Sequence, residues 1–177
     1  MKKVARFTAG VVGGWLLGAA FSWAAAPTDV PENLKAPAGE QLILETHAKG
    51  VQIYTCQAGS GGPPAWTLKA PDAQLSDSKG KPIIHHFEGP TWMHKDGSAV
   101  TGKAAARADS PDKSSVPWLL LTATGHTGSG VLAKVTSVQR LHTQGGQPPA
   151  TGCDATKIGA ETRSAYTADY YFYAPAR

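Results

Sequence analysis

Short runs of strand-forming residues alternate with glycine- and proline-containing turns along most of this sequence of 177 residues. The chain holds 20 glycines and 13 prolines, and no window carries a convincing amphipathic helix. Alternation of this kind is typical of antiparallel β-proteins, in which each short strand ends in a turn. We therefore predict an all-β fold, a single-domain antiparallel sandwich or barrel of about eight to ten short strands.

The predicted strands are rich in β-branched or aromatic residues, and they cover 41–47, 51–56, 65–70, 82–87, 91–94, 98–107, 116–124, 131–143 and 166–173. The residues at 48–50, which end in Gly50, are interpreted as the turn of a hairpin, and so are those at 95–97. The alanine-rich stretch at 99–107 is also the best candidate for a helix, so this segment stays open between strand and helix.

The last predicted strand alternates between two faces. Successive side chains of a strand point to opposite sides of the sheet, so alternate residues share a face. The two sets are Tyr166, Ala168, Tyr170 and Phe172 on one face and Thr167, Asp169, Tyr171 and Tyr173 on the other.

The first 26 residues show the three-part pattern of a secretory signal peptide, with a cationic start, an apolar stretch at 7–21 and small residues at 24–26. The apolar stretch holds 15 residues, four of them glycine, whereas a membrane anchor needs about 20 apolar residues. We expect cleavage after Ala24, with Ala26 as the alternative, and export to the periplasm or the extracellular space without a stable membrane anchor. The predicted divisions are 1–24 for the signal peptide, 25–39 for an extended Pro-rich lead-in and 40–177 for the β-domain.

Cleavage leaves a nearly neutral protein. The formal net charge of the whole chain is +4, but three of its 17 basic residues, Lys2, Lys3 and Arg6, belong to the predicted signal peptide. The 14 basic residues that remain face 13 acidic ones, a net charge of +1. We therefore expect no nucleic-acid partner, because binding to nucleic acid requires a strongly basic surface.

Cys56 and Cys153 are the only cysteines in the chain. Outside the cytosol such a pair usually forms a disulfide, and no C-x-x-C spacing suggests redox catalysis instead. The two positions are 97 apart, so the predicted bond closes most of the domain. A loop of this size is worth up to about 4–5 kcal/mol in the chain-entropy treatment.

Three histidines, His85, His86 and His94, lie within ten residues of one another. His85 and His86 would point to opposite faces of a strand, so regular strand geometry does not let both bind one metal. A divalent-metal site formed by His86, His94 and Asp96 is kept as an alternative if the chain turns back at 89–90. Because no recognised ligand spacing is present, the simpler interpretation is a strand histidine bonded to a backbone carbonyl, with no cofactor.

Aromatic residues offer the other candidate site. Trp118 lies inside an apolar run and is interpreted as core. Trp92 follows a Gly-Pro step and precedes a turn, where side chains reach solvent. We therefore expect Trp92 to contribute to a ligand-binding surface together with His86 and Asp96.

No catalytic residue is predicted. The sequence lacks a G-x-S-x-G nucleophile motif, a phosphate-binding loop and a dinucleotide-binding fingerprint. Paired carboxylates for glycoside hydrolysis cannot be selected either, because nothing constrains the spacing of the acidic residues.

Four runs stand out along the chain: VQIYTC at 51–56, HFEGPTW at 86–92, PWLLL at 117–121 and YTADYYFY at 166–173. Together with other runs they resemble the DUF3455 family of exported bacterial and fungal proteins. The resemblance spans essentially the whole mature chain and implies export and a single domain. It implies no catalytic residue, since the family is named for having no assigned function.

We therefore expect an exported, disulfide-stabilised β-domain that acts as a non-catalytic binding module. Its expected partner is a small ligand, a glycan or another component of the cell envelope. The alternative is a metal-binding protein or metal-dependent enzyme that uses His86, His94 and Asp96. The two classes differ in whether those three side chains meet.

Overall fold

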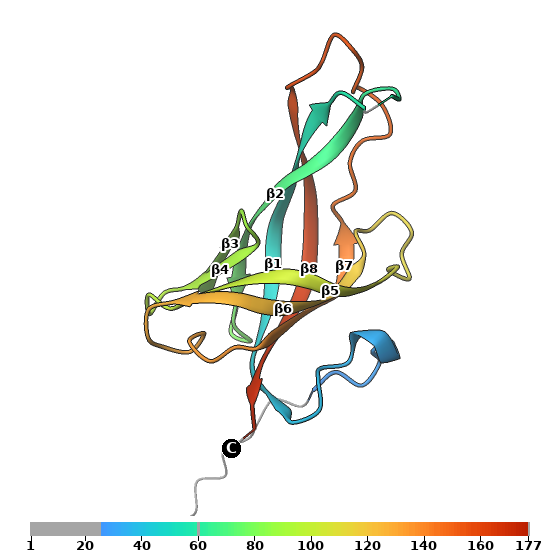
Figure 1. Cartoon of the computed structure of the whole chain (residues 1–177). Helices are drawn as coiled ribbons and strands as arrows, with labels where there is room; N and C mark the ends of the chain where they lie inside the picture. Colours follow the sequence, from blue (N-terminus) through green and yellow to red (C-terminus); the bar gives the residue numbers. More distant parts are fainter. Residues whose placement is uncertain (1–25, 60, 177) are drawn as a thin grey trace, which may run out of the picture.

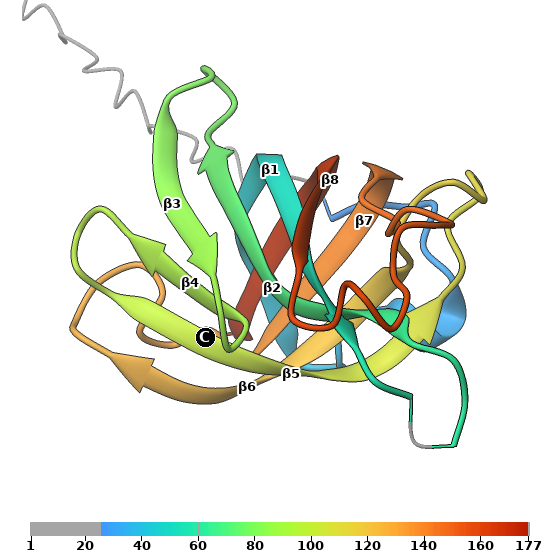
Figure 2. The same ribbon diagram turned by 90° about the horizontal axis from the view of Figure 1, so that it is seen from above.

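The strands of this chain close into one antiparallel barrel, which the computed structural model describes over residues 26–59 and 61–176 (Figure 1). Each strand pairs with the next in sequence, and β8 pairs with β1 to complete the ring (Figure 2). The strands are β1 (Glu40–Gln57), β2 (Ala65–Ser76), β3 (Pro82–Phe87), β4 (Thr91–His94), β5 (Ala99–Ala108), β6 (Trp118–Thr127), β7 (Ser137–Gly145) and β8 (Glu161–Pro175). The prediction of an all-β antiparallel fold is confirmed. Of the two predicted architectures, sandwich and barrel, the structure is a barrel.

The predicted hairpin turn at 48–50 is wrong, because β1 runs through it without interruption for 18 residues. Gly50 pairs with Ala73 of β2 on one side and with Tyr166 of β8 on the other. A Cβ atom at Gly50 would lie 2.2 Å from the Asp72 carbonyl oxygen and 2.4 Å from the Ala73 Cα. The glycine is therefore required by a close approach of two strands, which is the other common reason for glycine in a sheet.

The predicted strand at 131–143 is only partly correct. Residues 128–136 form the β6–β7 loop instead, and in this loop Leu132 and Val135 are fully buried in the core inside the barrel. β7 begins at Ser137. The segment at 99–107 belongs to β5, so its strand interpretation is correct and its helix interpretation is wrong. Within the described residues the helical element is η1 (Glu32–Leu34), a short 3-10 turn in the lead-in.

Two separate clusters of buried residues lie on the two faces of the barrel wall. The predicted alternation along β8 is confirmed, since Tyr170 and Phe172 pack inside the barrel and Tyr171 and Tyr173 pack outside. The inner cluster also contains Leu75, Ile84, Val100, Leu121, Leu132, Val135 and Val138. The outer cluster contains Leu34, Leu42, Trp118 and Leu141. Trp118 is 6% exposed, so its core assignment is confirmed.

The lead-in covers this outer cluster. Leu34 is fully buried there, and the Gln139 side-chain amide donates to the Leu34 carbonyl oxygen at 2.6 Å. The Asn33 amide donates to the Arg107 carbonyl oxygen at 3.0 Å. The lead-in therefore lets large aromatic residues face outward from the barrel without exposure to water.

The predicted signal peptide, residues 1–24, lies outside the described residues. In the part of the chain that the structure describes, no helix combines the length and the apolar character needed to cross a membrane.

The predicted disulfide between Cys56 and Cys153 is confirmed, with the two sulfur atoms 2.07 Å apart. It joins the end of β1 to the long β7–β8 loop at 146–160. Backbone hydrogen bonds flank it, because Cys56 N–H donates to the Ala160 carbonyl at 2.8 Å and Gly159 N–H donates to the Cys56 carbonyl at 2.9 Å. The bond therefore fixes the loop against the barrel wall.

Reduction of the disulfide, or the variant Cys153→Ala, should lower the melting temperature by about 10 °C. The expected loss is about 4 kcal/mol, because a closed loop of about 100 residues regains its freedom in the unfolded chain. The check is thermal unfolding followed by circular dichroism with and without reductant. The Cys153→Ala variant serves as the control, since reductant should not lower its melting temperature further. An unchanged melting temperature for the reduced wild-type protein would contradict the expectation.

Gly50→Ala should also destabilise the barrel, because the new methyl group would overlap the backbone of β2. We expect a loss of about 2 kcal/mol, or roughly 5 °C in melting temperature. Gly62→Ala is the matched control, since a Cβ atom there meets nothing within 4 Å. Equal melting temperatures for the two variants would show that the strands separate easily at Gly50.

Candidate functional site

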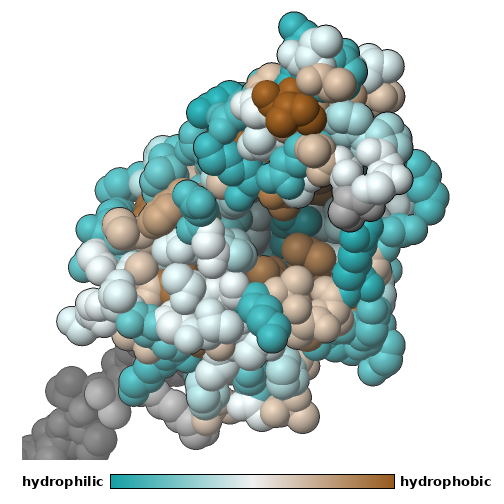
Figure 3. Space-filling model, turned by 45° about the horizontal axis from the view of Figure 1, so that its top comes forward, coloured by the Kyte–Doolittle hydropathy of each residue, from teal (hydrophilic) through white to brown (hydrophobic). Residues whose placement is uncertain are grey.

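A cavity of about 610 Å³ enters the barrel from one end. We call this end the mouth; Gly89, Pro90, Pro117, Gln147 and Pro148 line the cavity there, on the β3–β4, β5–β6 and β7–β8 connections. In the space-filling view, which brings the top of the molecule forward, a hollow with hydrophobic atoms at its floor opens near the middle of the face (Figure 3). The candidate site is therefore the interior of the barrel rather than its outer surface.

Small residues on one strand create the space for this cavity. Gly102 and Ala104 of β5 face the interior, opposite the larger side chains of the other strands. A Cβ atom at Gly102 would lie 3.1 Å from the Trp92 ring, so glycine leaves room for the indole. Leu119 and Leu121 of β6 complete the apolar part of the lining. The apolar walls thus follow from strand alternation combined with small residues on β5.

His86 and Trp92 form a stacked pair in the cavity wall. They are cross-strand partners on β3 and β4, and their ring centroids lie 4.4 Å apart with planes inclined by 3°. His86 Nδ1 lies 2.9 Å from the Thr91 carbonyl oxygen, which confirms the interpretation of a strand histidine bonded to the backbone. The expectation that Trp92 reaches solvent is wrong, because its side chain is only 1% exposed and faces the cavity instead.

Burial decides the charge of the histidine. It lowers the pKa of His86 to about 3, because an imidazolium ion loses its hydration inside the barrel. His86 is therefore neutral at physiological pH. Since a carbonyl oxygen only accepts, the proton of the neutral ring lies on Nδ1, and Nε2 is left as an acceptor.

Arg140 brings a positive charge into the same interior. It lies on β7 opposite Tyr170 of β8, on the inward-facing side, and it is 8% exposed. Its Nε and Nη2 groups donate to the Pro117 carbonyl oxygen at 3.2 and 2.8 Å. Burial raises the pKa of the hydroxyl groups of Tyr54 and Tyr170, and the nearby guanidinium partly offsets this effect.

Two further buried donors lie in the cavity lining. Within the described residues, three buried side-chain donors have no hydrogen-bond partner in the protein: Gln52 Nε2 and Trp92 Nε1 belong to the cavity lining, and Trp118 Nε1 lies in the outer cluster. By contrast, the Tyr54 hydroxyl donates to the Gly146 carbonyl at 2.7 Å and so ties β1 to the β7–β8 loop. A buried donor left without a partner costs about 1–3 kcal/mol, so a ligand that accepts hydrogen bonds in the cavity would recover part of this free energy.

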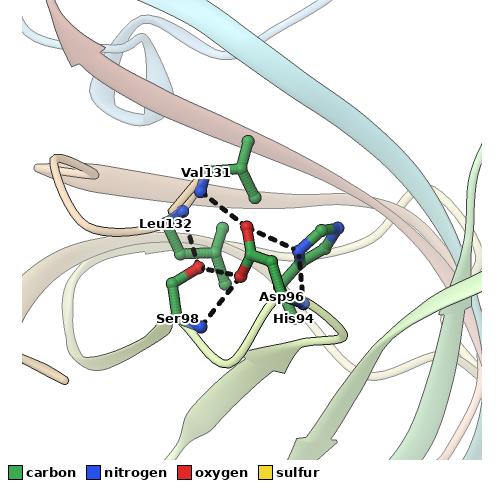
Figure 4. A network of polar contacts seen from close by, with 5 residues as sticks. All are labelled: His94, Asp96, Ser98, Val131 and Leu132. Carbon is green, nitrogen blue, oxygen red and sulfur yellow. Dashed lines mark hydrogen bonds and ion pairs between the residues drawn. The ribbon is translucent and has the colours of Figure 1, made fainter. Parts of the chain in front are cut away.

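Asp96 lies at the opposite end of the barrel, in the β4–β5 turn, and binds the β6–β7 loop (Figure 4). Its carboxylate accepts from the backbone N–H and the hydroxyl of Ser98 at 2.8 and 2.6 Å and from the Val131 N–H at 2.9 Å. His94 Nδ1 lies 3.0 Å from the same carboxylate, and Ser98 Oγ accepts from Leu132 N–H at 3.1 Å. This network holds the buried loop in place and closes that end.

The three residues of the alternative metal site do not come together. His94 and Asp96 pair with each other, but His86 is bonded to Thr91 and stacked on Trp92. Among the described residues, no group of three or more His, Cys, Asp or Glu side chains is arranged to hold a metal ion. Of the three residues predicted for ligand binding, Trp92 and His86 line the cavity, whereas Asp96 belongs to the closing network.

Asp96→Asn should lower the melting temperature at neutral pH, because the amide cannot replace a carboxylate that accepts from several donors. These donors hold the pKa of Asp96 well below its ordinary value of 3.8, so the folded protein favours the carboxylate. That stabilisation is complete above about pH 4 and is lost as the pH falls toward the lowered pKa. The difference in melting temperature between wild type and variant should therefore narrow from pH 7 to below pH 3.

Asp109→Asn is the control for this experiment, since Asp109 is exposed and makes only a 3.9 Å ion pair with Lys113. Its melting temperature should follow the wild type at every pH. A difference for Asp96→Asn that stays constant or grows as the pH falls would contradict the assigned role of the carboxylate.

The sequence analysis missed Arg140, Gln52 and Tyr54. Arg140 follows Gln139 in a strand of mixed polarity and carries no local signal, whereas a local signal existed for Gln52, which stands between Val51 and Ile53. A polar side chain in such a position is either at a bulge or turned into a polar interior. Only the pairing of β7 with β8 shows that Arg140 faces inward.

The fold and the site define an antiparallel β-barrel protein whose internal cavity is lined in part by the buried guanidinium group of Arg140. The chain belongs to the DUF3455 family, whose model matches residues 37–174 and is described as a protein of unknown function. The resemblance seen in the sequence is thereby confirmed. No curated protein and no solved structure matches the chain.

Proposed function

We propose that this protein binds a small, largely apolar ligand inside the barrel without converting it. The observation that carries the proposal is the cavity of about 610 Å³, lined by apolar side chains and a few convergent polar groups. Cavities of several hundred Å³ with this mixed lining are the usual form of small-molecule sites. A flat glycan-stacking surface receives less support, because the Trp92 ring faces the interior.

The electrostatics of the site favour binding over catalysis. His86 has a pKa of about 3 and so is a weak base at neutral pH, where general bases are most effective near their own pKa. The Tyr170 hydroxyl in the cavity lining has a raised pKa because it is buried, so it does not ionise readily. These groups are suited to hydrogen bonding rather than to proton transfer.

The proposed setting is outside the cytoplasm, in the periplasm or the extracellular space. The signal-like pattern in residues 1–26 and the disulfide between Cys56 and Cys153 both support it. In that setting a soluble barrel would carry or retain a poorly soluble molecule in an aqueous compartment.

A neutral fluorescent probe tests the proposal. N-phenyl-naphthylamine should bind saturably, one molecule per chain, with the rise in emission expected of an apolar environment. Ala104→Trp should weaken binding by about tenfold or more, because its side chain would fill the cavity. Ala105→Trp is the matched control, since Ala105 is exposed and does not belong to the lining.

The two variants make the result specific to the interior. Wild type and Ala105→Trp should bind the probe equally well, and circular dichroism should show that both variants are folded. The proposal fails if the wild-type protein does not bind the probe, or if Ala104→Trp binds it as tightly as Ala105→Trp.

A further inference from the structure

We infer that the natural ligand is an anion, an apolar molecule with one carboxylate or similar oxyanion that pairs with Arg140 inside the barrel. This inference rests on the proposed function, because it names the chemical class that the same cavity accepts. The charge of the lining, the burial of Arg140 and the arrangement of donors each support it.

The lining of the cavity is positively charged. It contains Arg140, Arg107 and Lys69, and within the described residues no acidic side chain belongs to it. Lys69 is already paired with Glu161, at 2.5 Å, so its charge is compensated outside the cavity. Arg107, an exposed residue of β5, and Arg140, a buried residue of β7, leave the interior with an excess of positive charge. An anion is the ligand whose charge this lining complements.

The burial of Arg140 supports an anionic ligand more strongly than the net charge of the lining does. Its side chain is almost fully buried, yet none of the ion pairs in the described part of the chain includes it. Buried charges in proteins are normally paired, because an uncompensated one loses its hydration without replacement. The Pro117 carbonyl accepts from two of the five guanidinium N–H groups and supplies only a partial negative charge. A ligand carboxylate would supply the full charge and match the planar guanidinium.

The other buried polar groups fit the same ligand. Gln52 Nε2 and Trp92 Nε1 are donors, and a carboxylate is an acceptor with two oxygens. The same cavity lining therefore holds two donors without partners in the protein and the guanidinium of Arg140, which has no acidic partner. Leu119 and Leu121 in the same lining provide the surface for the apolar part of the molecule.

A matched pair of probes tests the charge preference. Anilinonaphthalene sulfonate and N-phenyl-naphthylamine share the same aromatic body, and only the first carries an anionic sulfonate. The wild-type protein should bind the sulfonate about tenfold more tightly than the neutral amine, as expected for hydrogen bonds to a charged group. Equal or weaker binding of the sulfonate by the wild-type protein would overturn the inference, whatever the variants do.

The variant Arg140→Gln tests whether Arg140 causes the preference for the anionic probe. This variant removes the charge and keeps an N–H donor, so the ratio of the two affinities should fall from about tenfold to near one, whichever way the affinity for the neutral amine itself changes. Arg163→Gln is the matched control, because Arg163 is 59% exposed and its Nη1 lies 3.4 Å from Asp72 on the outside of the barrel. Arg163→Gln should bind both probes as the wild type does. A preference that persists in Arg140→Gln would overturn the role of Arg140.

Competition with aliphatic ligands extends the test from a sulfonate to a carboxylate. Decanoate should displace bound N-phenyl-naphthylamine at about tenfold lower concentration than decanol, and Arg140→Gln should remove this difference. If neither probe binds the wild-type protein, the proposed function itself has failed. If the neutral probe binds but decanoate and decanol compete equally, the cavity binds ligands and the inference about charge is wrong.

Discussion

Closure of the sheet through the β1–β8 pairing is the constraint on which the rest of this structure depends. Once the ring is closed, each strand has one face toward the interior and one toward the outside, and every residue is assigned to one of them. Tyr170 and Phe172 are committed to the interior, and Tyr171 and Tyr173 to the outside. Because the outside set is also aromatic, the lead-in is needed to cover it. Inside the barrel, the small residues Gly102 and Ala104 of β5 leave room for the Trp92 ring and for the cavity.

The two ends of the barrel differ because different loops close them. At one end, Asp96 and Ser98 hold the β6–β7 loop, and Leu132 from that loop fills the interior. At the mouth, the β7–β8 loop is tied by the disulfide and by the Tyr54 hydroxyl, and its residues Gln147 and Pro148 line the cavity. The cavity lining accordingly includes residues of the mouth and none of the β6–β7 loop.

The sequence was sufficient for what depends on local pattern. The all-β class, the disulfide and the alternation along β8 follow from period-two spacing and from cysteine count. The prediction of a turn at Gly50 was wrong because glycine occurs both in turns and where two strands approach closely. Only the position of the β2 backbone shows that the second case applies here. Trp92 and Asp96 were misjudged for a similar reason. Whether a side chain beside a turn meets solvent, a cavity or another loop is decided by residues such as Val131, which lies 35 positions from Asp96 along the chain. Arg140 was not predicted because its importance comes from being buried without an acidic partner, and the sequence alone does not show which residues surround it.

The position of β8 in the chain also affects how folding proceeds. β8 is the last strand, and it supplies one edge to β1 and the other to β7. Until residues near 161–175 are available, the earlier strands form an open sheet with two unpaired edges, and such edges can pair with other chains. The ring therefore cannot be completed stepwise as the polypeptide emerges. Until its last segment has docked, a protein of this topology stays open to pairing with other chains along the edges of β1 and β7.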